Sequence, residues 1–118
     1  MKRLSILLVV IIILVSFTAC DSNVVKGTII QNSDNDYAVL DIMPQKLFEI
    51  AEVGESVVVI IGDFQMEMSL VDDLTEEDGK LQLYYNSEEH SLNIVSYNQN
   101  FCEIYNIPVN SKVKIQKH

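Results

Sequence analysis

Basic residues are scarce in this sequence. Lysine and arginine number 8 against 17 aspartates and glutamates, so the formal net charge at pH 7 is −9. Nucleic-acid binding depends on Lys and Arg that neutralise phosphates, and so acidic a chain argues against it. The same deficit argues against electrostatic docking on anionic lipid headgroups. We therefore expect no nucleic acid among the partners of this chain.

Histidine and cysteine are equally scarce, with 2 of each. His90 and His118 are too few and too far apart along the chain for a histidine-based metal site. Cys102 follows Phe101, a setting that favours a buried, inert thiol, although a catalytic thiol with His90 as its base is the alternative. No nucleophile-elbow pattern is present. The sequence thus predicts no catalytic residue, no metal and no cofactor.

One long apolar run lies at the N-terminus. It extends from Leu4 to Phe17 and follows the basic residues Lys2 and Arg3. Its length fits a secretory signal peptide and is short for a bilayer span. The run ends in F-T-A-C at 17–20, which resembles a bacterial lipoprotein signal, whose cysteine becomes the new N-terminus and carries the lipid.

This N-terminus predicts a division of the chain and a location. We expect residues 1–19 to form a signal peptide, residues 20–24 a lipidated tether and residues 25–118 a single domain. Cys20 would carry the lipid, including palmitate, and the lipid would hold the protein at the membrane. The mature protein would then be extracytoplasmic and anchored to the cell membrane, and Cys102 would have no disulfide partner. An uncleaved signal anchor is the alternative.

Alternation of apolar and polar residues predicts strands through most of the domain. The clearest case runs from Phe64 to Leu70, and Leu81–Tyr85 repeats the pattern. The β-branched run Ser56–Ile61 favours a buried strand. Further strands are expected at 25–31, 37–42, 92–95 and 113–115.

Two segments have helical spacing instead. The first, 44–52, begins with Pro44, which suits the first turn of a helix. The second, 98–106, places Phe101 and its apolar neighbours at helical intervals, and we expect Phe101 in the core. Methionines are expected to fill the core at positions 43, 66 and 68.

A short pattern occurs twice in the chain. Val53–Val59 and Val109–Ile115 each follow a helical segment, and each begins with a turn and continues as a strand. Gly54 and Asn110 both suit the left-handed position of such a turn. Seven short strands close most naturally as a barrel, which removes exposed edges. The predicted fold is therefore all-β and mainly antiparallel, a small closed seven-stranded β-barrel with two short helices.

The order and spacing of these segments resemble the C-terminal domain of the SAM hydroxide adenosyltransferase and fluorinase family. That domain has a hairpin, then V-G-D-x-V-x-V-x-I-G, then an N-S loop with a strand, a short helix and a final V-G-D-x-V-x-I. The matching segments here are Tyr37–Ile42, Val53–Gly62, Asn86-Ser87 with Leu92–Val95, and Val109–Ile115. The resemblance covers nearly all of residues 25–118 and implies a small closed barrel.

The resemblance also suggests partners. Family enzymes form trimers, with SAM between the N-terminal domain of one subunit and the barrel of the next. The barrel supplies part of the adenosine pocket, and the N-terminal domain supplies most catalytic groups. That N-terminal domain has no counterpart here. A homotrimer, an unknown protein partner and a nucleoside-like ligand are the partners that the resemblance implies.

Four residues are candidates for ligand binding. Asn86 and Ser87 match the polar pair that the family places at its nucleoside pocket. Asp41 stands where the family has the Asn of T-N-I, and Tyr97 replaces an Asn after the following strand. We expect the loop 86–90 and Tyr97 to gather at one end of the barrel.

Charge and aromatic residues around these candidates limit the ligand. Tyr84 and Tyr85 would add an aromatic face for a base. Glu88 and Glu89 would repel an anion, which leaves a nucleoside or SAM itself as the favoured ligand. The acidic segment 72–79 could bind Ca²⁺, but it lacks EF-hand spacing and is better explained as a solvated loop.

The sequence therefore predicts a membrane-anchored lipoprotein with a non-catalytic module that binds a small molecule or a protein. The alternative is part of an enzyme that acts on SAM or a nucleoside and needs a separate catalytic domain. No constellation of acid, base and nucleophile accompanies the predicted barrel.

Overall fold

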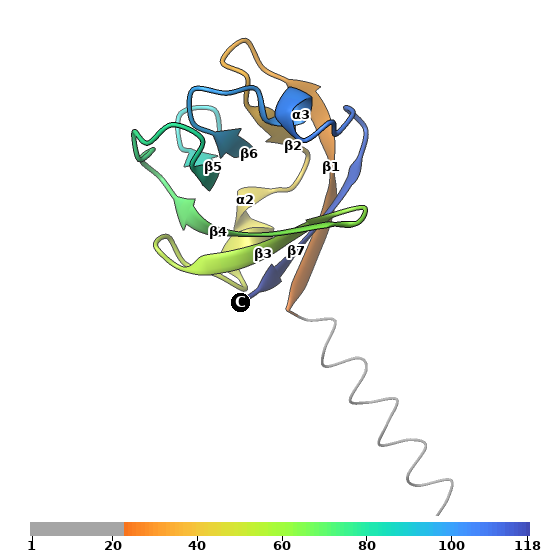
Figure 1. Cartoon of the computed structure of the whole chain (residues 1–118). Coiled ribbons are helices and arrows are strands. Elements are labelled where there is room, and N and C mark those ends of the chain that lie inside the picture. Colours follow the sequence, from red (N-terminus) through yellow and green to blue (C-terminus); the bar gives the residue numbers. More distant parts are fainter. Residues whose placement is uncertain (1–22) are drawn as a thin grey trace, which may run out of the picture.

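Seven strands and two short helices make up residues 23–118, the part of the chain that the computed structural model describes (Figure 1). The strands are β1 (Val24–Asn32), β2 (Ala38–Leu40), β3 (Ser56–Ile61), β4 (Phe64–Val71), β5 (Leu81–Asn86), β6 (Ser91–Ser96) and β7 (Lys112–Lys117). The helices are α2 (Pro44–Phe48) and α3 (Phe101–Ile104). The predicted signal peptide and Cys20 lie outside the described residues. Within residues 23–118, no helix is long and apolar enough to cross a membrane.

The strands close into a barrel in the order β1-β2-β6-β5-β4-β3-β7, which confirms the predicted fold class. The β1–β7 pair completes the circle, with Val25 opposite Ile115. Every neighbouring pair is antiparallel except β4 and β5, which run parallel with Leu70 opposite Leu83. All seven strands lie between Val24 and Lys117, so a fragment of residues 21–118 contains the whole barrel.

Alternating side chains fill the barrel interior. β3 alternates between partly and fully buried residues, and β4 between exposed and buried ones, with Met66, Met68 and Leu70 inside. Because successive residues of a strand point to opposite faces, this pattern places one apolar set in the core. Met43 departs from the prediction that the methionines fill the core: it lies immediately before α2 and is 61% exposed.

The two helices are shorter than the sequence predicts. Of the helix predicted over 98–106, only α3 forms. Asn98 and Asn106 adopt left-handed backbone angles, φ 59° and 52°, which a right-handed helix does not contain. Asn100 caps α3 by accepting a hydrogen bond from the Glu103 backbone N–H at 3.1 Å. Phe101 is fully buried, as predicted.

The pattern that occurs twice in the sequence folds twice into the same turn. Gly54 and Asn110 both have left-handed backbone, with φ of 98° and 79°. The Gly54 N–H donates to the Leu70 carbonyl at 2.7 Å, and the Asn110 N–H donates to the Ile29 carbonyl at 2.7 Å. Both predicted left-handed turns are therefore confirmed.

Strand pairing extends this repeat to two strand pairs of the barrel. β3 and β7, which follow the two turns, pair with Val59 opposite Ile115. The same spacing in the chain separates Ala38 from its partner Ile94 in the β2–β6 pair. Corresponding residues thus face each other, so the segments β2-α2-β3 and β6-α3-β7 are related by an approximate two-fold axis through the barrel.

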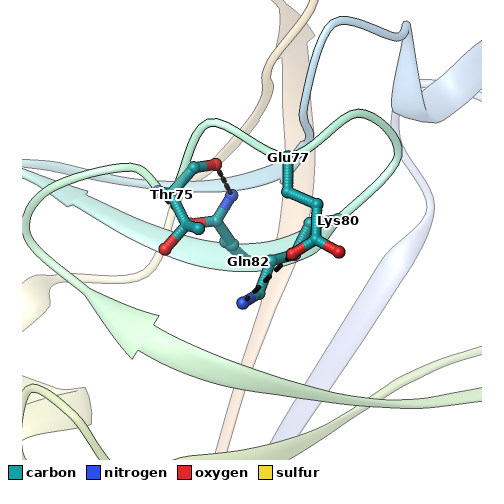
Figure 2. Close-up of polar contacts among 4 residues, drawn as sticks. All are labelled: Thr75, Glu77, Lys80 and Gln82. Carbon is teal, nitrogen blue, oxygen red and sulfur yellow. Dashed lines mark hydrogen bonds and ion pairs between the residues drawn. The ribbon is translucent and has the colours of Figure 1, made fainter.

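The acidic loop between β4 and β5 is fixed to the outer face of the barrel (Figure 2). Gln82, fully buried on β5, accepts a hydrogen bond from the Thr75 N–H at 2.7 Å and donates one to the Thr75 carbonyl at 3.1 Å. An ion pair joins Glu77 to Lys80 at 3.8 Å, with both side chains largely exposed. The Gly79 N–H also donates to the Tyr97 carbonyl at 2.8 Å, so the buried Gln82 amide holds the start of the loop and backbone pairing holds its end.

Replacing Gln82 with leucine should therefore loosen this loop. The Thr75 N–H would lose its partner, and the Thr75 carbonyl would keep only the hydrogen bond from the Glu77 N–H. We expect this to lower the free energy of unfolding by roughly 1–2 kcal/mol, since water can reach part of the loop. Hydrogen exchange at residues 75–80 should accelerate. Glu77→Gln is the matched control and should cost less than about 1 kcal/mol, because exposed ion pairs contribute little. Equal effects of the two variants would contradict this role of Gln82.

Candidate functional site

Asp41 and the loop 86–90 lie at the same end of the barrel. Asp41 follows Leu40, whose partner on β6 is Leu92, close to that loop. The Asp41 carboxylate is not free, because its Oδ1 accepts a hydrogen bond from the Thr28 N–H at 2.6 Å. This bond joins β1 to the end of β2, beyond the register shift between Ile29 and Gln31. Asp41 thus has a structural partner.

The Asn86 side chain also forms hydrogen bonds within the protein. Its Oδ1 accepts hydrogen bonds from the backbone N–H groups of Glu88 at 3.0 Å and Glu89 at 3.2 Å. This is the turn-forming role that asparagine side chains commonly play. Ser87 is exposed at the tip of the same turn. Of the polar pair expected at a nucleoside pocket, Asn86 therefore shapes the hairpin turn and Ser87 is exposed at its tip.

An exposed cluster joins this turn to α2. The His90 ring lies 3.1 Å from the Tyr85 hydroxyl through Nδ1 and 3.4 Å from Gln45 Nε2 through Nε2. Phe48 contacts Tyr85 edge-on, with ring centroids 5.1 Å apart. Both His90 nitrogens thus have polar neighbours at this end of the barrel, and neither is Cys102. Burial raises the pKa of the Cys102 thiol, which favours the inert reading of that residue.

Tyr97 lies at the opposite end of the β5–β6 hairpin, so the prediction that it gathers with Asn86 and Ser87 is wrong. Asn86 pairs with Ser91 at one end of the hairpin, whereas Leu81 pairs with Ser96, next to Tyr97, at the other. Asp41 follows β2 and Tyr97 follows β6, and these two strands run antiparallel. Their ends therefore point in opposite directions, which separates the predicted site residues.

Tyr97 instead lines a hollow that we name the tyrosine pocket. Two loops, one between β1 and β2 and one after β6, meet near the upper end of the barrel in Figure 1. They enclose a volume of about 360 Å³. The residues that line it are Asn35, Asp36, Tyr37, Tyr97, Asn98 and Gln99.

Local hydrogen bonds hold the lining residues in place. Asp36 and Asn98 both adopt left-handed backbone, φ 66° and 59°, at the tips of their loops. The Asn98 Nδ2 donates to Asp78 at 2.6 Å, and Asp36 accepts from the Asn100 Nδ2 at 3.1 Å. Gln99 accepts a hydrogen bond from the Ser96 hydroxyl at 2.7 Å through its Oε1. The pocket is thus prearranged by contacts with the acidic loop and α3.

A third tyrosine adjoins the pocket. Tyr84 lies on the outer face of β5, because its neighbours Leu83 and Tyr85 pack against the core. Its ring meets that of Tyr37 edge-on, with centroids 6.0 Å apart and an interplanar angle of 80°. Burial raises the pKa of Tyr37, and the nearby hydroxyls of Tyr84 and Tyr97 raise it further. Tyr37 therefore stays a neutral hydroxyl donor at physiological pH.

Two other hollows have a different character. One, of about 350 Å³, lies between the β3–β4 turn and the segment 106–112 and includes Phe64 and Lys112. The other, of about 560 Å³, lies beside α3 and includes Cys102 and Glu103. Within residues 23–118, no group of three or more His, Cys, Asp or Glu side chains is placed to hold a metal ion. The tyrosine pocket differs from both of these hollows in that its lining consists of two tyrosines, three amide side chains and one carboxylate, with no aliphatic side chain.

Sequence analysis missed most of this pocket. The sequence predicts a strand over 37–42, whereas β2 begins one residue later, at Ala38, so Tyr37 lies in the loop before it. The available signal was the pair of tyrosines next to strand ends, Tyr37 before β2 and Tyr97 after β6. Because β2 and β6 are antiparallel neighbours, these two positions must lie side by side.

No known protein-family profile matches the sequence, and no curated protein matches it. Among solved structures, the barrel is similar to that of an uncharacterized conserved protein from Thermotoga maritima, with a TM-score of 0.72 and 12% sequence identity. The match covers 80% of this chain and 36% of that chain, so this chain spans little more than a third of the length of the Thermotoga protein. At this identity the similarity shows the fold alone.

Proposed function

We propose that this chain is a non-catalytic binding module whose tyrosine pocket holds a small, uncharged, polar ligand. The observation that carries the proposal is the convergence of Tyr37, Tyr97 and the Asn98 and Gln99 amides around one hollow of about 360 Å³. This volume lies within the range of about 300–1,000 Å³ that is typical of small-molecule sites. A protein segment that offers an uncharged polar side chain would suit the same chemistry.

We further propose that the module is displayed outside the cytoplasm as a lipoprotein, anchored through Cys20. The F-T-A-C segment and the apolar run before it support this. The predominance of acidic residues, 17 against 8 basic ones, would keep the domain itself off anionic lipid, so the lipid chain would provide the membrane attachment.

Ligand binding to the tyrosine pocket should be visible as thermal stabilisation of residues 21–118. A ligand that binds the folded state at 100 times its Kd stabilises it by about 2.7 kcal/mol, which raises Tm. A screen of uncharged polar compounds, with adenosine and SAM included, should yield stabilising ligands whose effect disappears in Tyr97→Ala. Calorimetric titration of each ligand would then give its Kd.

Two further variants make the screen specific. Tyr97→Phe keeps the ring and removes one hydroxyl, so it should retain part of the binding. Phe48→Ala removes an exposed aromatic ring near the other end of the barrel and should leave binding unchanged. Ligands that stabilise wild type and Tyr97→Ala equally would contradict the assignment of this pocket.

Replacing Cys20 with serine should abolish lipid attachment. We expect a Cys20→Ser chain that incorporates no labelled fatty acid and keeps its first 19 residues, because lipidation precedes signal cleavage in lipoproteins. Metabolic labelling with membrane fractionation and mass measurement of the purified chain checks both results. Normal labelling and processing of Cys20→Ser would rule out this anchor, whereas Cys102→Ser is the matched control and should be labelled like wild type.

The alternative is that this barrel contributes to an enzyme that acts on SAM or a nucleoside. It is supported by the resemblance to the C-terminal domain of the SAM hydroxide adenosyltransferase and fluorinase family, in which the N-terminal domain supplies most of the catalytic groups. The Thermotoga protein also extends well beyond the shared barrel. Under this reading a homotrimer or a separate catalytic subunit would complete the site, and SAM or adenosine would be the stabilising ligand in the screen.

A further inference from the structure

We propose that the ligand of the tyrosine pocket is a neutral saccharide. The proposal rests on the proposed function in one respect, namely that this pocket is the binding site, and it adds the chemical class of the ligand. Three features of the pocket carry it: the hydrogen-bonding groups of its lining, its aromatic rings and its charge.

The hydrogen-bonding groups suit a ligand rich in hydroxyls. Side-chain amides offer both donors and acceptors, carboxylates accept, and tyrosine hydroxyls do either. Among residues 23–118, the hydrogen bonds of the pocket engage Asn98 through its Nδ2 and Gln99 through its Oε1. The opposite atoms of the two amides, one acceptor and one donor, are then available to a ligand. A sugar ring, which carries hydroxyls around its rim, can pair with both kinds of group at once.

The aromatic rings suit the apolar face of a sugar. Tyr37 and Tyr97 line the pocket from two adjacent loops, and Tyr84 supports Tyr37 edge-on at 6.0 Å. The face of an aromatic ring carries partial negative charge, which attracts the C–H bonds on one side of a pyranose. A nucleobase could stack on the same rings, but most of the lining consists of amide and carboxylate side chains, which can pair with many hydroxyls around a sugar ring and with only a few groups on the edge of a base.

The charge of the pocket disfavours anions. Asp36 is the one charged residue among the six that line it, and Asp78 holds the Asn98 amide from outside. In the lining, a phosphate or sulfate would meet the Asp36 carboxylate and no lysine or arginine. A nucleotide or an acidic sugar is therefore a poor fit, and a neutral saccharide meets no such penalty.

The test is an NMR titration of ¹⁵N-labelled residues 21–118. The probes are cellotriose, maltotriose, triacetylchitotriose and, for comparison, adenosine. At least one saccharide should shift the backbone amide signals of Asp36, Asn98 and Gln99 in a saturable way. Its Kd should rise roughly tenfold or more in Tyr97→Ala and less in Tyr97→Phe. Phe48→Ala should bind like wild type, and the dispersion of each variant's own spectrum reports whether it is folded.

Each other outcome has a distinct meaning. If adenosine shifts the pocket signals and no saccharide does, the ligand class is wrong while the binding module stands. If saccharides shift signals around His90 rather than around Asn98, the pocket assignment is wrong. If no probe of either class perturbs Asp36, Asn98 or Gln99, both the saccharide proposal and the pocket as a small-molecule site are overturned.

Discussion

Phe101→Ala should lower the free energy of unfolding by roughly 3–5 kcal/mol. Phe101 is fully buried at the start of α3, and the centroid of its ring lies 5.0 Å from the centroid of the Tyr105 ring. Truncation removes most of the ring's buried apolar surface and leaves a cavity in a small closed barrel that has little freedom to collapse. A loss of this size is a large share of the 5–15 kcal/mol that typically stabilises a domain.

Urea unfolding of residues 21–118, followed by far-ultraviolet circular dichroism, measures this loss. Because the sequence contains no tryptophan, fluorescence would depend on tyrosine alone. The slope m should stay constant, so that the change in midpoint reflects stability. Phe48→Ala is the matched control, since Phe48 is 38% exposed and contacts Tyr85 at the surface. It should cost less than about 1.5 kcal/mol. A Phe101→Ala loss below about 1 kcal/mol would contradict the packing of α3.

The strands could be predicted because their signals are local. Gln65 to Val71 alternates in sequence and in burial, although the pattern fails at Phe64, which is exposed at the β3–β4 turn. The β-branched run Ser56–Ile61 forms β3 with the predicted bounds. The repeated turn was also visible, because Gly54 and Asn110 are residue types that tolerate a left-handed backbone. The length of the second helix was overestimated because Asn98 before α3 and Asn106 after it have left-handed backbone angles that helical spacing does not reveal.

The sequence could not predict that β4 and β5 run parallel. Alternation shows that each segment is a strand, but it says nothing of direction, and the loop 72–80 that links them is short for a crossover. This loop is fixed to the outer face by Gln82, whose alternation pattern predicts only an outward-facing polar residue. The complete burial of Gln82 depends on Thr75, which lies in a loop segment without hydrophobic periodicity.

The site was predicted less well than the fold, for a geometric reason. Asn86 and Tyr97 are close in sequence, which favoured the prediction that they line one binding site. They stand at the two ends of one antiparallel hairpin, so the length of β6 separates them. Tyr37, which lies far away in the sequence, is the residue that meets Tyr97 across the β2–β6 pair. Pairing between strands, rather than distance along the chain, decides which side chains form the pocket.

Gly27→Val should also destabilise the barrel severely, by roughly 3–5 kcal/mol. A Cβ atom at Gly27 would overlap Ile42 Cγ1 and lie 2.6 Å from Asp41 Oδ1. Overpacking of this kind typically costs about 1–3 kcal/mol, and the two γ carbons of valine would add to it. Displacing Asp41 would also break its 2.6 Å hydrogen bond with the Thr28 N–H, and a bond to a charged group contributes about 1.5–3 kcal/mol.

Replacing Gly27 also has a stabilising effect, which is smaller than the cost of crowding. Replacing glycine restricts the unfolded chain and can stabilise a protein by about 0.4–1 kcal/mol where the backbone fits. This gain applies at Gly27, which pairs with Val113 as a regular β1 residue, but it does not offset the crowding. Gly27→Ala should show the same sign as Gly27→Val with a smaller loss, and Lys26→Ala, at the exposed neighbouring position, should be nearly neutral.

A double-mutant cycle identifies the cause of the Gly27 effect. Ile42 is buried, so Ile42→Ala alone should be destabilising, but it removes the Cγ1 and Cδ1 atoms that a side chain at position 27 would meet. Gly27→Val should therefore cost less in the Ile42→Ala background, with a coupling energy of roughly 1–3 kcal/mol. Additive losses in urea unfolding would show that crowding against Ile42 is not the reason for glycine here. The close approach of β1 to the chain after β2, which also aligns Thr28 with Asp41, would then require another explanation.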